Sequence, residues 1–167
     1  MTSAGPRPLR DDKWNRNDRE GGATIAKTSE EDIGRIVLDC AMMVHRALGP
    51  GLQESAYESC LAYELLATGL KIERQLTLPL RYKGLAITTG YRIDLLVANL
   101  VVIEVKAIEK VSDVHRAQLL SYLKLGGWRL GYLLQLQCRD DEGWRTTDGQ
   151  WTVIRRDRRG FCDVRLG

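Results

Sequence analysis

The chain has 167 residues, 44% of them hydrophobic and 28% charged. These values are ordinary for a globular protein and allow one domain with a buried core, but not two. No apolar run approaches the roughly 20 residues of a membrane span or a secretory signal, so we expect no membrane association and a cytoplasmic location. The net charge is +3, but residues 29–134 carry twelve basic and twelve acidic residues. Composition therefore gives no support for nucleic-acid binding, although a local basic patch could still exist.

Residues 1–28 mix Arg, Asp, Asn, Gly and Pro with few apolar side chains and no periodicity. This composition predicts a disordered extension. Order is expected to begin at Ser29, because S-E-E-D at 29–32 has the form of a helix capping box.

Two helices are expected next. Apolar residues recur at helical spacing between positions 33 and 48, and the sequence G-P-G at 49–51 ends this helix. A second helix is expected from about 53 to 68, with Gly69 after its end. Both helices place most of their apolar residues on neighbouring faces, as helices that cover a core do.

The rest of the domain is expected to form a sheet and one more helix. The expected elements are strands at about 71–82, 90–98 and 100–107, a helix at about 113–125 and a strand at 128–134. Pro79 makes the first strand an edge strand or a bent one. The predicted order is α-α-β-β-β-α-β, with no internal repeat.

The cysteines do not indicate a zinc site. No Cys-x-x-Cys pair is present and the chain has only two histidines, so the usual zinc ligands are too few. Reduced thiols are the better interpretation for all four: Cys40, Cys60, Cys138 and Cys162.

Two acidic residues fall on neighbouring predicted strands. If residues 98–100 form a tight connection, Val97 faces Val101 across an antiparallel pair, and counting back three places puts Asp94 opposite Glu104. Directly opposed residues have Cβ atoms roughly 4.5–5.5 Å apart. Two carboxylates at that separation repel unless a proton or a cation lies between them.

Such a pair suits a hard divalent cation, Mg²⁺ or Mn²⁺, which takes oxygen ligands and keeps several waters. Lys106 follows Glu104 by two positions and shares its face of the strand. Its ammonium could orient or help to deprotonate an attacking water, or stabilise charge that develops on a phosphate. The alternative is a solvated hairpin face with an ordinary Glu–Lys arrangement, and spacing alone does not decide between the two.

Four further residues are candidates for the same site. Glu54 follows the Gly-Pro-Gly turn and could supply a third carboxylate, or could be a favourable charge in a first helical turn. Gln118 and Tyr122 are spaced i, i+4 and share a helix face; the alternative is a polar flank and one core aromatic. His115 lies one turn earlier and could join them, although a lone histidine is more often structural.

Several motifs in order resemble a known family. The sequence G-L-Q-E-S-A-Y at 51–57 matches the pattern that names the GxxExxY protein family, which resembles the PD-(D/E)XK nuclease superfamily. The resemblance also includes V-H-R-A-L-G-P-G-L at 44–52, Y-R-I-D-L-L-V at 91–97, I-E-V-K-A at 103–107 and A-Q-L-L-S-Y-L-K-L at 117–125. It implies an α/β fold for residues 29–134: a PD-(D/E)XK nuclease-like αβββαβ core, a mixed sheet flanked by helices, with an extra N-terminal helix.

The resemblance also implies roles for residues. Carried over by position, Glu54, Asp94, Glu104 and Lys106 become the acidic catalytic site, and Gln118 with Tyr122 resemble the Q-x-x-x-Y helix motif of RecB-like nucleases. We expect Asp94, Glu104 and Glu54 to bind the metal, with the carbonyl of Val105 as a further ligand. Gln118 and Tyr122 are expected to support the site or to bind nucleic acid, with His115 as a further candidate from its position. Ile93 stands where the superfamily name has proline, a departure that leaves the carboxylate in place.

These features predict metal-dependent hydrolysis of phosphodiester bonds in DNA or RNA, with nucleic acid as the partner. One alternative is a catalytically silent module that binds nucleic acid or protein and retains the nuclease fold, as the neutral core would allow. A small enzyme of another kind that uses the same carboxylates is a further alternative. The sequence leaves the oligomeric state open.

Residues 135–167 depart from the ending that relatives of this family usually have, which resembles N-F-N-V-x-x-x-K-D-G. A one-base change of reading frame can convert codons for residues 133–144 into L-L-N-F-N-V-A-M-M-K-D-G. We therefore hypothesise that residues 135–167 arise from a frameshift, natural or from a sequencing error. The hypothesis predicts a tail that packs poorly, with Trp144, Trp151 and Phe161 as accidental apolar residues. If no one-base change in the nucleotide sequence restores that ending, the hypothesis is wrong.

Overall fold

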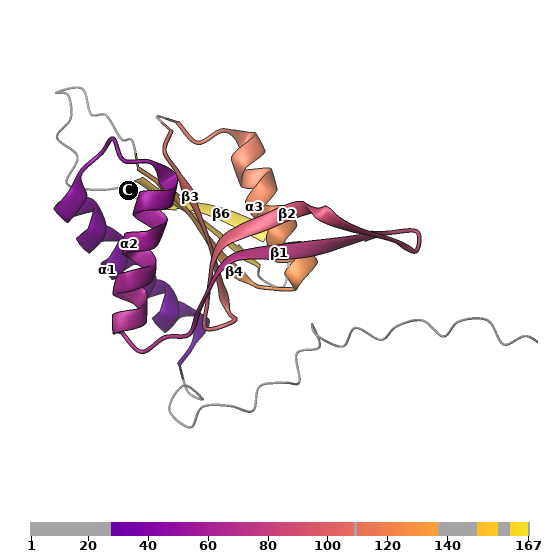
Figure 1. The fold of residues 1–167 in the computed structure, drawn as a ribbon, viewed down its shortest axis with the longest axis horizontal. Helices are drawn as coiled ribbons and strands as arrows, with labels where there is room; N and C mark the ends of the chain where they lie inside the picture. Colours follow the sequence, from indigo (N-terminus) through magenta and orange to yellow (C-terminus); the bar gives the residue numbers. More distant parts are fainter. Residues whose placement is uncertain (1–27, 109, 137–149, 157–160, 167) are drawn as a thin grey trace, which may run out of the picture.

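The computed structural model describes residues 28–108, 110–136, 150–156 and 161–166. This part of the chain forms an α/β fold (Figure 1). Its elements are α1 (Glu30–Leu48), α2 (Glu54–Ala67), β1 (Ile72–Tyr82), β2 (Leu85–Val97), β3 (Val101–Lys106), α3 (Asp113–Gly126), β4 (Leu130–Gln135), β5 (Gln150–Arg156) and β6 (Phe161–Leu166). The predicted order of elements through the fourth strand is confirmed. The predicted N-terminal extension lies outside the described residues, except for Thr28.

The strands form one mixed sheet in the order β1-β2-β3-β4-β5-β6. β3 and β4 run parallel, with α3 as the crossover between them, and the other neighbours are antiparallel. Helices α1 and α2 pack on one face of the sheet and α3 packs on the other (Figure 1). The central strand β3 is therefore covered on both sides: Ile103 and Val105 face α1 and α2, whereas Val102 faces α3.

Helix α1 begins with the predicted capping box. The Ser29 side chain accepts a hydrogen bond from the Asp32 backbone N–H (3.1 Å), and the Asp32 carboxylate accepts one from the Ser29 N–H (3.2 Å). These two bonds satisfy N–H groups that have no partner within the helix. The helix ends at Leu48 because Gly49 has a φ of +68°, which a glycine adopts at little cost. None of the helices in the described ranges has the length and apolar character needed to cross a bilayer.

The Tyr57 hydroxyl joins the two helices that pack on the same face. This tyrosine of α2 is fully buried, and its hydroxyl donates to the Ala41 carbonyl of α1 at 2.6 Å. Burial also raises the pKa of the phenol above its ordinary value. The tyrosine of the G-x-x-E-x-x-Y motif at 51–57 thus makes a structural contact that fixes α2 against α1.

We expect Tyr57→Phe to lower the free energy of unfolding by about 1–2 kcal/mol, because a buried hydrogen bond is lost while the ring still fills its place. Urea denaturation measures this change. Tyr63→Phe is the matched control, since the Tyr63 side chain is exposed on the same helix. Equal stability of the two variants would contradict the structural role of the Tyr57 hydroxyl.

The prediction that the tail packs poorly is wrong for β5. All residues of β5 from Gln150 to Arg155 pair with β4, and Trp151 is 5% exposed with its ring edge-on to His45. Val153 belongs to the core below α1 and α2, and Ile154 to the core below α3. β-branched and aromatic residues in β5 give it strand character and let it cover the edge of β4.

Phe161 begins β6, which pairs with β5, and Trp144 lies outside the described residues. The frameshift hypothesis concerns the origin of the tail and stays a prediction for the nucleotide sequence. Cys40 and Cys60 are free thiols, as predicted.

Strands β1 and β2 form one long hairpin, because β2 begins at Leu85 and not near residue 90 as predicted. Lys83 and Gly84 connect the strands with φ values of +46° and +88°. A two-residue turn with both φ angles positive matches the twist of antiparallel strands. β1 lies at the edge of the sheet, as its proline predicts, and Pro79 falls where the β1–β2 register shifts.

Candidate active site

The predicted register between β2 and β3 is confirmed up to the site itself. The paired residues are Val97–Val101, Leu96–Val102 and Leu95–Ile103. Asp94 precedes Leu95 on β2, and at this level the contact with β3 is made by the Asp94 side chain. Its Oδ2 accepts a hydrogen bond from the Val105 backbone N–H at 2.9 Å. The contact holds the Asp94 carboxylate against β3, one residue from Glu104.

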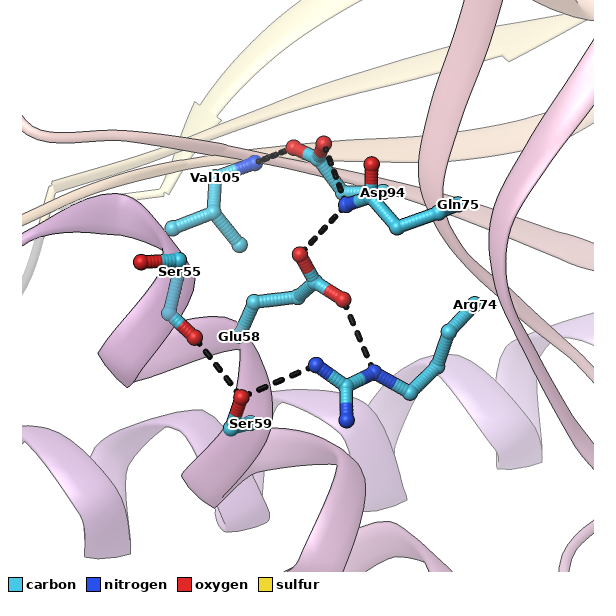
Figure 2. Close-up of polar contacts among 7 residues, drawn as sticks. All are labelled: Ser55, Glu58, Ser59, Arg74, Gln75, Asp94 and Val105. Atoms are coloured by element: carbon cyan, nitrogen blue, oxygen red, sulfur yellow. Dashed lines mark hydrogen bonds and ion pairs between the residues drawn. The ribbon is translucent and has the colours of Figure 1, made fainter.

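The neighbouring strand β1 is also interrupted at this level. Gln75 has a φ of +50°, and the β1–β2 pairs resume on either side of it. A positive φ is uncommon for a residue with a side chain, and such conformations concentrate at functional sites. Here the Gln75 Nε2 atom lies 2.5 Å from Glu58 Oε2 and 3.4 Å from Asp94 Oδ1 (Figure 2). The amide thus bridges two carboxylates that would otherwise repel.

Glu58 is a residue of this cluster that the sequence interpretation missed. It is 4% exposed, and its Oε1 accepts a hydrogen bond from Arg74 Nε at 2.9 Å. Arg74 also donates to the Ser59 hydroxyl, so α2, β1, β2 and β3 are linked by one chain of polar contacts (Figure 2). A sequence signal existed, because Glu58 follows Glu54 by one helical turn and precedes the buried Leu61 by three positions.

Glu104 is the most buried carboxylate of the cluster, with 2% of the residue exposed. Its Oε2 lies 3.3 Å from Lys106 Nζ. Its Oε1 is buried and has no hydrogen-bond partner among the described residues. Desolvation, followed by the charge of Asp94, raises the Glu104 pKa to about 8 although Lys106 opposes the shift. A buried carboxylate oxygen without a partner is costly, and a cation would satisfy it.

The other two charged groups respond to the same environment. Burial raises the pKa of Asp94, more than the hydrogen bond from Val105 lowers it. Burial alone would lower the pKa of Lys106, but the charges of Glu104, Asp94 and Glu54 raise it above its ordinary value. The pKa values of Asp94, Glu104 and Lys106 are thus all raised, so each group holds its proton more tightly than in water. Such a cluster has too little positive charge for its carboxylates.

The residues present fit a divalent cation held by two carboxylates. Asp94 and Glu104 supply the oxygens, and the orphaned Glu104 Oε1 marks where positive charge is missing. Within the described ranges, no group of three or more His, Cys, Asp or Glu side chains is placed to share an ion. Glu54 does not complete such a group: it is exposed, and its Oε1 accepts a hydrogen bond from the Ala107 N–H at 2.9 Å.

Gln118 and Tyr122 lie together on α3, as predicted from their spacing. Gln118 Nε2 donates to the Tyr122 hydroxyl at 2.5 Å, and the Tyr122 ring lies edge-on to Tyr91 of β2 at 5.7 Å. Desolvation, then the charge of Glu104, raises the Tyr122 pKa. Tyr122 is 2% exposed and, because the charge of Glu104 acts on it, lies near that carboxylate on the α3 side of the sheet.

His115 has a structural role at the start of α3. Its Nδ1 accepts a hydrogen bond from the Ser112 backbone N–H at 3.2 Å and lies 3.1 Å from the Ser112 hydroxyl. These contacts cap the helix. A contact of His115 with nucleic acid, like the use of the Val105 carbonyl as a metal ligand, stays a prediction.

Two carboxylates and a lysine thus meet on the neighbouring strands β2 and β3 of a mixed sheet that has helices on both faces. The family model described as PD-(D/E)XK nuclease superfamily matches residues 31–147. The chain therefore belongs to the PD-(D/E)XK nuclease superfamily, whose nucleases generally use divalent metals. No curated protein and no solved structure matches the chain.

The match confirms the predicted superfamily, whereas membership of the GxxExxY family stays a prediction. It also continues to residue 147, beyond the predicted domain end at 134. Together with the pairing of β5 on β4, this extent shows that the folded unit includes part of the segment interpreted as a tail.

Proposed function

We propose that this protein is a metal-dependent nuclease that hydrolyses phosphodiester bonds of DNA or RNA. The observation that carries the proposal is Glu104, a nearly inaccessible carboxylate whose Oε1 has no hydrogen-bond partner within the described part of the chain. It lies beside Asp94, and its Oε2 is 3.3 Å from the Lys106 amine. A fold gains no stability from such an arrangement, because burying an incompletely paired charge is unfavourable. A binding site for a cation and a phosphate explains it.

Asp94 and Glu104 would hold Mg²⁺ or Mn²⁺, with the Val105 carbonyl as a further oxygen and Glu54 acting through water. When bound, the ion supplies Lewis-acid stabilisation of the negative charge on the scissile phosphate. The two carboxylates are held in different ways. Asp94 is fixed by the Val105 N–H and by Gln75, whereas Glu104 is fixed by burial and by Lys106.

The remaining residues of the site bind, orient and exclude water. Lys106 donates from a partly buried position next to Glu104, so it can hold an attacking water or a phosphate oxygen near the carboxylates. Tyr122, with its hydroxyl bound to Gln118, closes the α3 side of the site. Glu58 and Gln75 are positioning residues, because they reach the site through Asp94.

The test is cleavage by the purified full chain with Mg²⁺ or Mn²⁺ on a panel of single-stranded, double-stranded and structured DNA and RNA. We expect metal-dependent cleavage of at least one substrate, abolished by EDTA. Lys106→Met keeps much of the apolar stem of the side chain and removes the ammonium, so we expect a loss in turnover on the order of 10²–10³-fold.

Lys124→Met is the control for the lysine change, since Lys124 is exposed on α3. Cleavage that survives Glu104→Ala and Lys106→Ala together would reject this site, because the double variant removes both the buried acid and the amine. Absence of cleavage by the wild-type chain on every substrate with both metals would reject nuclease activity itself.

A further inference from the structure

The β1–β2 hairpin extends away from the rest of the molecule. Figure 1 shows its outer part projecting beyond the sheet and the helices. The base of the hairpin is anchored, because Leu78 and Ile93 belong to the core that packs on α3. Beyond the register shift at Pro79, only the pairs from Leu80–Ile87 to Tyr82–Leu85 hold the two strands together. Isolated two-stranded ribbons are marginally stable in water, so a projecting one points to a partner.

Positive charge predominates along this hairpin, because the two acids of its strands, Glu73 and Asp94, lie at the inner end. Residues 74–93 contain four basic residues and no acidic one, whereas the rest of 29–134 contains eight basic and twelve acidic residues. Arg74 is used in the contact with Glu58. The Lys83 and Arg92 side chains are exposed. Although residues 29–134 are neutral in total, residues 74–93 are basic and the remainder is acidic. A basic segment of this kind attracts a polyanion.

The tip also presents apolar side chains to solvent. Tyr82 and Leu85 face each other across the strands and are 59% and 61% exposed. Lys83 Nζ lies 5.5 Å from the centre of the Tyr82 ring. Exposed apolar side chains next to cations are typical of surfaces that contact bases or sugars as well as phosphates.

We propose that the outer part of the β1–β2 hairpin is an arm that lies in the major groove of double-stranded DNA. The inference rests on the proposed function, because it places the scissile phosphate at Asp94 and Glu104. The major groove of B-form DNA admits a two-stranded β-ribbon, whereas the deep and narrow major groove of A-form RNA does not. Lys83 at the tip and Arg92 at the base of the arm, opposite Thr77, contact phosphates. Tyr82 and Leu85 contact base edges such as thymine methyl groups.

The geometry sets a distance between the arm and the site. Along β1, Tyr82 is seven residues from Gln75, which contacts Asp94. At about 3.3 Å per residue, the tip lies about 23 Å from the carboxylates, which corresponds to about seven base pairs of duplex. The arm therefore engages only DNA that continues at least about seven base pairs to one side of the cut.

Binding of the full chain to duplex DNA in EDTA tests the arm without cleavage. We expect Lys83→Glu with Arg92→Glu to weaken duplex binding by about tenfold or more, and to reduce the slope of log affinity against log salt by about two. Tyr82→Ala should weaken binding several-fold. The controls are Lys124→Glu on α3 and Tyr63→Ala, an exposed tyrosine on α2; both should bind as the wild type does.

Hairpin variants that bind duplex DNA as tightly as the wild type would overturn the proposal. An equal loss of affinity for single-stranded DNA and double-stranded RNA would also overturn it, since the groove geometry would then be irrelevant. Thermal unfolding of each variant checks that the substitutions, all at exposed positions, leave the fold intact.

Cleavage of duplexes with different flanks separates the arm from the proposed function. With flanks of about four base pairs, Tyr82→Ala and the wild type should cut equally; with about twelve, the wild type should cut faster. Duplex binding that depends on the arm, without any cleavage, would reject the proposed nuclease activity and support the proposed role of the arm. Cleavage that is indifferent to the arm at both lengths would reject the arm and support the nuclease.

Discussion

Asp94→Asn is expected to abolish both cleavage and the stabilisation of the protein by Mg²⁺. The substitution conserves shape, and the side-chain oxygen of Asn can still accept the hydrogen bond from the Val105 N–H. The negative charge is lost, however, and with it the partner of the cation on β2. We expect turnover to fall on the order of 10³-fold or more, a larger effect than removing one hydrogen-bond donor.

Thermal unfolding with and without Mg²⁺ measures the second half of this prediction. A ligand at about 100 times its dissociation constant stabilises the folded state by about 2.7 kcal/mol, which raises the melting temperature of a chain of this size by about 5–10 °C. The wild type should show this rise and Asp94→Asn should not.

Asp113→Asn is a suitable control, because Asp113 is an exposed acid at the start of α3 that pairs with Arg116. It tests whether the metal acts through surface charge in general. A Mg²⁺-induced rise that persists in Asp94→Asn, or that disappears equally in Asp113→Asn, would contradict the assignment of Asp94 as a ligand.

The central part of this site could be predicted because strand geometry is local. A tight connection at residues 98–100 fixes the pairing of Val97 with Val101, and the two-residue period of a strand then determines where Asp94 and Glu104 lie. The i, i+4 spacing of Gln118 and Tyr122 is equally local. In both cases, the contact follows from positions within one helix or one hairpin.

The contacts that were missed depend on three elements at once. Gln75 reaches Glu58 and Asp94 only because its backbone takes a positive φ, and a glutamine gives no sequence signal for that conformation. Glu58 could have been chosen from its place on the buried face of α2. Its partner Arg74, however, lies on another element, and the pairing becomes visible only when α2 packs on β1.

The strand β5 was missed for a different reason. Its run of Trp151, Thr152, Val153 and Ile154 has ordinary strand composition. The prediction of a poorly packed tail depends instead on the difference between residues 135–167 and the ending that relatives of the family usually have. β5 pairs with β4 because this pairing satisfies backbone groups that an open sheet edge would leave without partners, and because its apolar residues cover the core.

Without metal, the protein is expected to lose stability as the pH rises from about 5 to 8. The Glu104 pKa is raised from 4.5 to about 8 in the folded state, so in this window the folded chain holds a proton that the unfolded chain has released. The unfolded state then binds fewer protons, and the free energy of unfolding falls by up to about 1.4 kcal/mol per pH unit. The raised pKa of Asp94 adds to the fall in the same direction.

Urea denaturation in EDTA across this pH range measures the slope for the wild type and for Glu104→Gln. The variant cannot ionise at this position, so its stability should change less with pH, and it should exceed the wild type by about 2–3 kcal/mol near pH 8. Its cleavage activity should nevertheless be lost. Asp113→Asn, which removes an exposed carboxylate at the start of α3, is the matched control. Parallel slopes for the wild type and Glu104→Gln would show that Glu104 is not a strained buried acid, and the cation would then lose its main reason to bind there.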